Sequence, residues 1–515
     1  METFRGLTRR EFLKLISLAP VGIYSRPLLK LAETANDGSL KNIIIIVFDA
    51  WSQRHVSLYG YPRRTMPNLE AFAEKATVYH NHYSTGTFTS PSTSTLLTGL
   101  HPWSHRAFQL GAGVASAHAG HTIFSALSST HSTLAYTQNK FADQLLYQSE
   151  GNLDNHVRNW LFNIQNTNLY GASVFKKDTR IAFATFQDNI LTKSKGYASS
   201  LFFDPLYQLG FLYDRLREKE KYASKYPHGV PGVDESFILP DVVDGAISLL
   251  KDIQQPSLAY IHFYPPHEPY TPTTQFFDSF INDGWRAPDK PMHDLAAKKD
   301  LPEKLAQARR YYDEFITSWD NEVARLFQFL KDSKLTDNSY IIVTADHGEL
   351  FERGEQGHWT KMIYDPIIHV PLIILSPGQE SRQDVHTITS SVDILPTVAH
   401  LTGNPMPDWA EGKLLPRFGG DVDEGRSVFS MDAKFNSAFG PLVNYAMSLT
   451  RDRHRLIHYS YRRDNYDKYE FYDLDSDPEE MKDLYPSQPS LAKQMQDELM
   501  QKVVDVNKPF QHDGL

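Results

Sequence analysis

A run of hydroxyl side chains over residues 86–99 has the composition of a catalytic turn. Its sequence, GTFTSPSTSTLLTG, predicts a tight loop that leads into a short helix. Ser90 would cap that helix, Pro91 suits its first turn, and Gly99 would end it. Thr89 would then lie beside the free amides of a helix N-terminus, where an anionic group is favoured. Its hydroxyl could attack phosphorus or sulfur there, although a turn of this kind is on its own usually just a helix cap.

Two apolar runs end abruptly in side chains that bind metal ions. They are KNIIIIVFDA over 41–50 and YIIVTADHGE over 340–349. Short runs of β-branched residues predict buried strands of a parallel sheet. Ligands of open α/β sheets bind beyond the carboxyl ends of the strands, which is where Asp49, Asp346 and His347 fall. Two carboxylates, an imidazole and a nearby hydroxyl therefore indicate a site for a divalent metal ion.

Other segments predict the elements that surround these positions. MPNLEAFAEKA over 66–76 and the stretch over 311–335 have helical spacing of their apolar residues. LAYIHFYPPHEPY over 258–270 predicts a strand followed by a proline-braced turn that presents His267. An isolated histidine after a strand is more often structural than functional, so the surrounding PHEPY motif carries most of the weight for His267.

Several motifs in a fixed order resemble the sulfatase-type members of the alkaline phosphatase superfamily. The matching stretches run from about residue 41 to about residue 486, apart from an insertion over about 143–235. The resemblance implies an α/β fold with an alkaline-phosphatase-like core, a mostly parallel central sheet flanked by helices, and a small C-terminal antiparallel-sheet α+β subdomain. The motifs are LYGYPRRTMPNLEAFAEKATVYHNHYS (58–84), TSPSTSTLLTGLHP (89–102), HFYPPHEPYTP (262–272), VTADHGE (343–349), HVPLII (369–374), SVDILPTVAHLTG (391–403) and YEFYDLDSDPEE (469–480).

The resemblance and the composition together predict three parts of the chain. A signal and linker would occupy 1–37, the catalytic α/β domain 38–415, and the C-terminal subdomain 416–515. The last part begins with short strand-like runs such as RSVFSM and YEFYDL and ends in a helical stretch over 489–504. The insertion is rich in aromatic residues, and we weigh a lid over the strand ends against an ordinary helical hairpin.

The N-terminal stretch LTRREFLKLISLAPVGIY over 7–24, with its paired Arg9 and Arg10, resembles a bacterial twin-arginine export signal. Its apolar part is too short for a membrane span, and a basic amphipathic helix is the alternative. We therefore expect the export machinery as a partner and a periplasmic or extracellular protein. A retained N-terminal tether is an alternative, because no clean cleavage site follows.

Composition excludes several kinds of site. The 515 residues include no cysteine, which excludes disulfides, thiolate metal sites and a formylglycine derived from cysteine. The formal net charge of −10 argues against nucleic acid as a partner and against broad attraction to an anionic membrane. A local basic group at an anion site is compatible with that total.

The nucleophile motif departs from the family pattern. Residues 89–93 read TSPST where family sulfatases show C/S-x-P-S-R, so Thr93 replaces the arginine that accompanies formylglycine. Threonine is not the known precursor of formylglycine. Thr89 instead resembles the direct nucleophile of phosphodiesterases and phosphoethanolamine transferases in the same superfamily. The resemblance thus implies that Thr89, activated by a metal ion, forms a phospho-threonine that water resolves.

The resemblance also implies that one divalent metal ion is held by Asp49, Thr89, Asp346 and His347. Many sulfatases carry a second acidic residue where this chain has Ala50, and some relatives have an asparagine in place of His347. Fewer oxygen ligands and an imidazole favour manganese or zinc, with calcium and magnesium as alternatives. One ion is expected because no second set of an aspartate and two histidines is evident.

Further residues match family positions that contact the ester group. His267 matches the histidine that contacts the ester oxygens or the leaving group, and Lys361 matches the lysine that binds the anion. Gln356 replaces a histidine of the family loop. His358 lies two residues further on and could recover that role or hold a second metal ion.

The stretch AYTQNKF over 135–141 stands where sulfatases usually supply a lysine and a histidine. Asn139 or Lys140 could substitute for them in contacting the substrate. The match is loose in this stretch, and a solvated side chain is the default interpretation for Lys140.

The expected function is metal-dependent hydrolysis of phosphate or phosphonate esters, diesters included. The substrate would be a small-molecule, glycan or lipid ester. One alternative is a sulfuric ester hydrolase without formylglycine, and another is a phospho-group transferase similar to phosphoethanolamine transferases. A binding protein on a decayed enzyme scaffold is a third, which the intact Asp49, Thr89, Asp346 and His347 argue against. The sequence gives no indication of oligomeric state.

Overall fold

The computed structural model describes residues 40–166, 213, 216–232, 235–487 and 490–510. The signal and linker expected over 1–37 lie outside these residues, as does the middle of the expected insertion, 167–212. The predictions of an export signal and of a lid therefore stay predictions. From Lys41 onward the chain forms a single unit.

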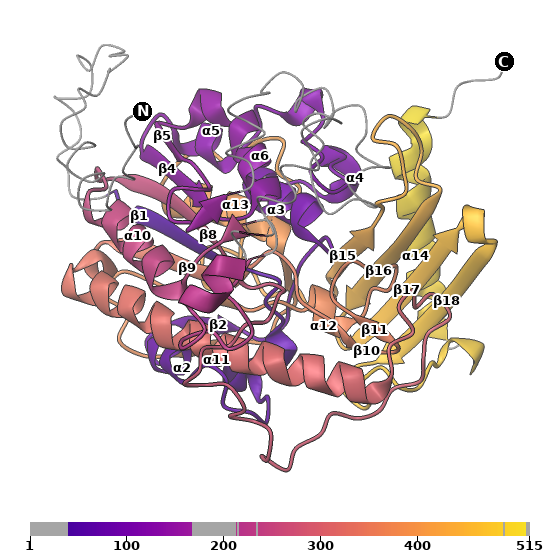
Figure 1. The fold of residues 1–515 in the computed structure, drawn as a ribbon. Coiled ribbons are helices and arrows are strands. Elements are labelled where there is room, and N and C mark those ends of the chain that lie inside the picture. Colours follow the sequence, from indigo (N-terminus) through magenta and orange to yellow (C-terminus); the bar gives the residue numbers. More distant parts are fainter. Residues whose placement is uncertain (1–39, 167–212, 214–215, 233–234, 488–489, 511–515) are drawn as a thin grey trace, which may run out of the picture. The chain divides into compact units, whose positions relative to one another are not determined.

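An eight-stranded sheet forms the centre of this unit (Figure 1). The two neighbours of β1, which are β9 and β8, both run parallel to it, whereas β12 runs antiparallel to both of its neighbours. The mostly parallel central sheet is thus confirmed. From one edge to the other, its strands are β13 (Gln383–Val385), β2 (Thr77–Tyr79), β12 (Leu372–Leu375), β9 (Ser339–Ala345), β1 (Asn42–Asp49), β8 (Ser257–Pro266), β4 (Ser132–Thr137) and β5 (Asn155–Val157).

Helices cover both faces of this sheet because its central strands are apolar on both. In β1, Ile44 and Phe48 contact one hydrophobic cluster, and the alternating Ile43 and Ile45 contact another. Burial on both faces explains why β1 reads as a continuous apolar run. The helices of the first cluster are α2 (Pro67–Ala73), α10 (Leu239–Lys251) and α11 (Pro302–Asp332). Those of the second are α3 (Thr89–Thr98), α5 (Ile123–Leu127), α6 (Lys140–Gln148) and α13 (Ile394–Leu401).

A four-stranded antiparallel sheet follows in the C-terminal part of the chain (Figure 1). Helix α14 (Ser490–Asn507) packs on one face of it through Ala492, Met495 and Leu499. The antiparallel C-terminal sheet with a closing helix is thus confirmed. Its strands, in order, are β15 (Ser427–Asp432), β16 (Asn444–Arg451), β17 (His454–Tyr461) and β18 (Tyr466–Asp473).

Short elements complete the described part of the chain. They are the helices α4 (Pro102–His105) and α12 (Asp365–Ile368), and the strand pairs β3 (His82–Tyr83) with β14 (Thr389–Ser390), β10 (Phe351–Glu352) with β11 (Glu355–Gln356), and β6 (Gln165–Asn166) with β7 (Glu235–Ser236). Among the helices of the described residues, none combines the length and the apolar character that crossing a membrane requires.

Helix α3 begins two residues earlier than its capping pattern suggests. Thr89 is its first residue and Phe88 its N-cap, so the prediction that Ser90 caps the helix is wrong. The hydroxyl of Ser90 instead accepts a hydrogen bond from the backbone amide of Gly111 at 2.8 Å. Gly99 ends the helix as predicted, with a φ of 67° in the left-handed region that glycine adopts without strain.

Helix α11 also starts earlier than predicted, at Pro302. Its buried Asp320 accepts hydrogen bonds from the amides of Asn68 and Leu69 at 2.9 and 3.0 Å. These bonds satisfy free amides in the first turn of α2, which Pro67 opens. Asp320 therefore fixes the start of α2, which is a structural role.

Candidate active site

Two aspartates and a histidine come together because β1 lies between β9 and β8. Phe48 of β1 is paired in parallel with Ala345 of β9. The next residues, Asp49 and Asp346, therefore emerge at the same edge of the sheet, at the carboxyl ends of their strands. On the other side of β1, His262 comes from β8. The predicted approach of Asp49 to Asp346 is thus present in the fold.

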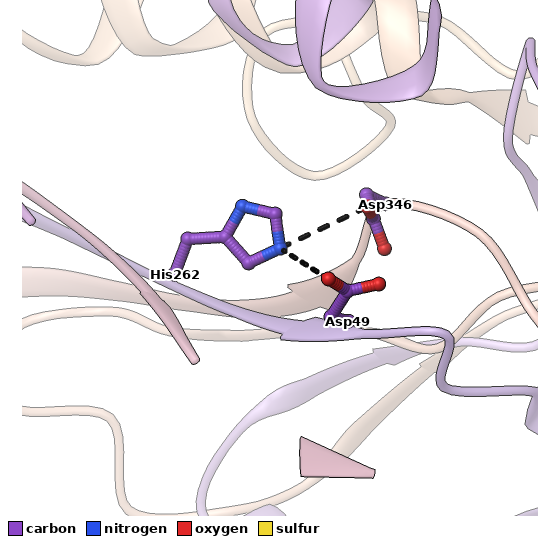
Figure 2. Close-up of side chains that lie close together, drawn as sticks. All are labelled: Asp49, His262 and Asp346. Atoms are coloured by element: carbon purple, nitrogen blue, oxygen red, sulfur yellow. Dashed lines mark ion pairs between the residues drawn. The ribbon is translucent and has the colours of Figure 1, made fainter. Parts of the chain in front are cut away.

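Four side chains converge at this edge, three of which Figure 2 shows. His262 Nε2 lies 3.9 Å from Asp49 Oδ2 and 3.8 Å from Asp346 Oδ2. His347 Nε2 lies 3.4 Å from Asp49 Oδ1 and 3.6 Å from Asp346 Oδ2. All four side chains are fully buried. Two carboxylates and two imidazoles within these distances have the composition of a metal site.

The donor atoms of this cluster support the same conclusion. Asp49 Oδ1, Asp346 Oδ2, His262 Nε2 and His347 Nε2 have no hydrogen-bond partner among the described residues. Buried polar atoms without partners are costly, and a cation bound between them would remove that cost. Asp49, His262 and Asp346 also meet the distance requirement for a shared metal ion. The residues therefore fit a divalent ion, and His262 is a candidate ligand that the sequence motifs did not reveal.

The charges of the cluster interact strongly. Burial alone would raise the pKa of Asp49, but the nearby His267, His347 and His262 lower it to about 2. Burial and the negative charge of Asp49 raise the pKa of Asp346 to about 6. Burial would lower the pKa of His347, but the two aspartates raise it to about 9. Repulsion between the two buried carboxylates is what a bound cation would relieve.

Asn139 links Thr89 to the cluster. The Nδ2 atom of Asn139 donates hydrogen bonds to Asp49 Oδ2 at 2.6 Å and to Thr89 Oγ1 at 3.2 Å. Its Oδ1 atom accepts from the amides of Phe141 and Ala142, so that Asn139 is also the N-cap of α6. Thr89 itself is buried at the first position of α3. One amide thus holds the threonine hydroxyl beside the carboxylate of Asp49, a candidate metal ligand.

A second group of side chains packs against His347. The ring centroid of His358 lies 4.4 Å from that of His347 and 4.7 Å from that of His267. His358 Nδ1 lies 3.0 Å from Glu349 Oε1, and both of these residues are buried. Burial lowers the pKa of His358 and raises that of Glu349. The structure therefore brings His267 and His358 together, with Glu349 as an anchor to which the sequence assigned no role.

Lys361 makes its contacts with the C-terminal sheet. Its ammonium pairs with Asp464, in the connection between β17 and β18, and lies 5.0 Å from the ring of Tyr461. A different lysine, Lys434, lies 5.5 Å from the ring of Phe88, the residue before Thr89. Lys434 is buried, and no family motif singled it out. Among the described residues, the contacts of Lys361 are thus with the C-terminal part of the chain, and Lys434 is the lysine beside the neighbour of Thr89.

Two family models match this chain. The sulfatase model matches residues 41–404, and a model described as the C-terminal part of N-sulphoglucosamine sulphohydrolase matches residues 354–508. The first range includes Thr89 and all the candidate metal ligands, which are Asp49, His262, Asp346 and His347. The second begins in the loop before His358 and extends through the C-terminal sheet and α14.

Individual proteins agree with these matches. An uncharacterized sulfatase of Escherichia coli, YidJ, is 24% identical over 302 residues, which are 54% of this chain and 58% of that protein. The alignment thus spans less than two thirds of that relative. The phosphonate monoester hydrolase of Agrobacterium radiobacter superposes with a TM-score of 0.64 at 18% identity and covers 90% of this chain and 96% of its own. A protein solved with its substrate D-glucosamine-2-N,6-O-disulfate gives a TM-score of 0.63 at 16% identity, covering 92% of this chain and 98% of its own. These two likenesses show that this chain shares the fold of both proteins.

Proposed function

Because this chain belongs to the sulfatase family, a family of ester hydrolases within the alkaline phosphatase superfamily, we propose that it hydrolyses phosphate or phosphonate esters with Thr89 as the nucleophile. One observation carries the proposal. The amide of Asn139 bonds both to the hydroxyl of Thr89 and to the carboxylate of Asp49, beside ligand atoms that have no hydrogen-bond partner in the described part of the chain. A hydroxyl held in this way is placed for attack on an ester whose charge the same cluster would stabilise.

The proposed site binds one divalent metal ion through Asp49, Asp346 and His347, with Thr89 and His262 as further ligands. Two carboxylates and two imidazoles favour manganese or zinc over calcium, which prefers an all-oxygen shell. When bound, the ion supplies the positive charge that makes the Thr89 hydroxyl easier to deprotonate and that offsets charge on the ester oxygens.

In the proposed reaction, Thr89 is the nucleophile and His267 transfers the protons of the alcohol and the water. Thr89 loses its hydroxyl proton to water, its Oγ1 forms a bond to the phosphorus, and the bond from phosphorus to the alcohol oxygen breaks. His267 donates the proton that the departing alcohol takes up, and it returns to its starting state by taking a proton from the attacking water. The oxygen of that water forms a bond to the phosphorus, the bond between phosphorus and Thr89 Oγ1 breaks, and Thr89 Oγ1 takes a proton back from water. His358, anchored by Glu349, packs against His267 and keeps its ring in place.

The threonine argues for phospho-esters over sulfate esters. Formylglycine releases sulfate when its hemiacetal collapses, a route that a threonine ester lacks. A sulfated Thr89 would need direct attack of water on sulfur, whereas a phospho-threonine is resolved by ordinary in-line hydrolysis. The structural likeness to a phosphonate monoester hydrolase is compatible with this preference. Among phospho-esters, singly charged diesters and phosphonate monoesters come first, because the site has no motif arginine to bind a second negative charge.

Two rival functions use the same residues. A sulfate ester hydrolase without formylglycine is favoured by the family name and by the sulfatase relative. A transferase would pass the phospho group from Thr89 to a sugar or lipid hydroxyl instead of water. The export of the protein to the periplasm or the cell exterior belongs to the proposal too, on the strength of Arg9 and Arg10.

A panel of 4-nitrophenyl esters tests the proposal. The purified protein is assayed after loading with manganese or zinc, using the phosphate monoester, a phosphate diester, a phenylphosphonate and the sulfate ester. The proposal expects the highest kcat/KM for the diester or the phosphonate. A clear preference for the sulfate ester would replace it with the sulfatase alternative. Product that appears only when an added alcohol accepts the phospho group would replace it with the transferase.

A further inference from the structure

Two partly exposed aromatic rings surround the ammonium of Lys434. Trp359 and Phe435 are each 40% exposed, and their ring centroids lie 4.9 and 5.8 Å from Lys434 Nζ. Phe88 packs edge-on against Trp359, with ring centroids 5.0 Å apart. Phe88 directly precedes Thr89. Trp359 and Phe435, together called the aromatic platform, therefore lie at the side of the candidate active site.

The backbone around Trp359 is fixed. Its neighbours His358 and Thr360 are both buried. His358 is bound to Glu349, and the carbonyl of Thr360 accepts a hydrogen bond from Lys434. The indole therefore emerges from a segment whose flanking side chains point into the protein.

Phe435 is presented in the same manner. It stands between Lys434 and Asn436, which are both buried. The Oδ1 atom of Asn436 accepts hydrogen bonds from the amides of Val443 and Asn444 at 2.8 and 3.0 Å, which closes the loop between β15 and β16. Arg106 donates to carbonyls of the same loop and ties it to the segment after α4. Rigidly held aromatic rings that remain in contact with water are a common feature of ligand sites.

An exposed ion pair flanks the platform. Lys361 Nζ lies 5.4 Å from the ring of Phe435 and pairs with Asp464. The side chains of Lys361 and Asp464 are 28% and 44% exposed, so both are accessible to a ligand. An ammonium donates hydrogen bonds and a carboxylate accepts them, which is the combination that binds hydroxyl groups.

We propose that the aromatic platform is a subsite for the ring of a hexopyranose whose hydroxyl carries the ester. The C–H face of the sugar stacks on Trp359 and Phe435, and its hydroxyls bond to Lys361 and Asp464. A phenyl group would stack on the rings without bonding to the Lys361–Asp464 ion pair. A short alkyl group would contact neither the rings nor the ion pair. The inference rests on the proposed function, because it requires that the ester group lies at Thr89.

Matched esters of primary alcohols test the subsite through a ratio. The ratio is kcat/KM for glucose 6-phosphate divided by that for ethyl phosphate, with the two corresponding sulfates and phenyl phosphate measured alongside. Trp359→Ala is expected to lower the sugar-to-ethyl ratio about tenfold, chiefly through KM, and Phe435→Ala to act in the same direction. Phe439→Ala is the control, because Phe439 lies in the same loop and is 90% exposed. An unchanged ratio in Trp359→Ala, an equal change in Phe439→Ala, or a loss confined to phenyl phosphate would overturn the sugar subsite.

A binding measurement without turnover separates this inference from the proposed function. Saturation-transfer NMR on the Thr89→Ala variant, with glucose 6-phosphate and glucose 6-sulfate as probes, is expected to show transfer to the C–H protons of the ring. Adding Trp359→Ala should remove that transfer. No transfer to either probe would overturn the subsite. Transfer to the sugar in a protein whose wild type hydrolyses none of the esters would uphold the subsite and overturn the proposed function.

Discussion

The side-chain amide of Asn139 donates a hydrogen bond to the hydroxyl of Thr89 at 3.2 Å. The same nitrogen also donates to Asp49 at 2.6 Å. Asn139 thereby links the proposed nucleophile on α3 to a proposed metal ligand on β1, and both elements lie far from it in the chain.

Replacing Asn139 by serine should lower kcat about 100-fold with little loss of stability. Serine retains an N-cap for α6 but is too short to reach Thr89 and Asp49 together. Steady-state kinetics and thermal unfolding of the same preparation provide the two readouts. If kcat stays near the wild-type value while the protein is folded, Asn139 does not position the nucleophile.

His262→Ala and His347→Ala should each reduce the amount of bound metal. Both imidazoles face the two aspartates with an Nε2 atom that has no hydrogen-bond partner among the residues that the structure describes, so each is expected to be a ligand. Elemental analysis of the wild type should give about one divalent ion per chain. His454→Ala is the control, since His454 lies in the C-terminal sheet. Full metal content in His262→Ala would remove that residue from the ligand set, and two tightly held ions in the wild type would assign a second site near His358.

Arg455→Met should destabilise the protein by about 3–5 kcal/mol, because it removes the buried guanidinium that two buried carboxylates share. Arg455 is fully buried and pairs with Asp365 and Glu480, each at 2.8 Å. Arg453→Met, at a side chain 50% exposed with looser ion pairs, should change stability by no more than about 1 kcal/mol. Denaturant unfolding of both variants measures the difference. Similar small losses in the two variants would show that the buried pairs of Arg455 contribute little.

Replacing both Arg9 and Arg10 by lysine should leave the protein in the cytoplasm, if the N-terminal segment is a twin-arginine signal. Cell fractionation with an antibody to the protein measures its location. Unchanged export of the double variant would contradict the signal.

The sequence predicted the strands of the site well, and the reason lies in their burial. β1 and β9 are covered on both faces, so each reads as one apolar run that ends at its functional side chain. His262 escaped notice because it lies within such a run, and only the pairing of β8 with β1 brings it to the cluster. A histidine within an otherwise apolar predicted strand is the feature of the sequence that could have indicated His262 as a ligand.

Other misses depended on contacts between distant segments. The family motif identified Lys361, but its ammonium pairs with Asp464 in the connection between β17 and β18. Lys434 lies in the loop between β15 and β16 and carries no motif, so only the folded chain places it near Phe88. The capping prediction for Ser90 failed by two residues, because the N-cap is Phe88, which is extended with a φ of −158°, and the helix starts at Thr89.

The nucleophile assignment can be measured directly by trapping the enzyme during turnover. The metal-loaded enzyme is quenched in acid while it hydrolyses a phosphate diester, and peptide mass spectrometry then locates any covalent phospho group. The account predicts a phospho group on Thr89, and in Thr89→Ala neither that adduct nor more than about a thousandth of the wild-type turnover. The account would be contradicted by the absence of an adduct during rapid wild-type turnover, by a formylglycine-like mass at position 89, or by wild-type rates in folded Thr89→Ala.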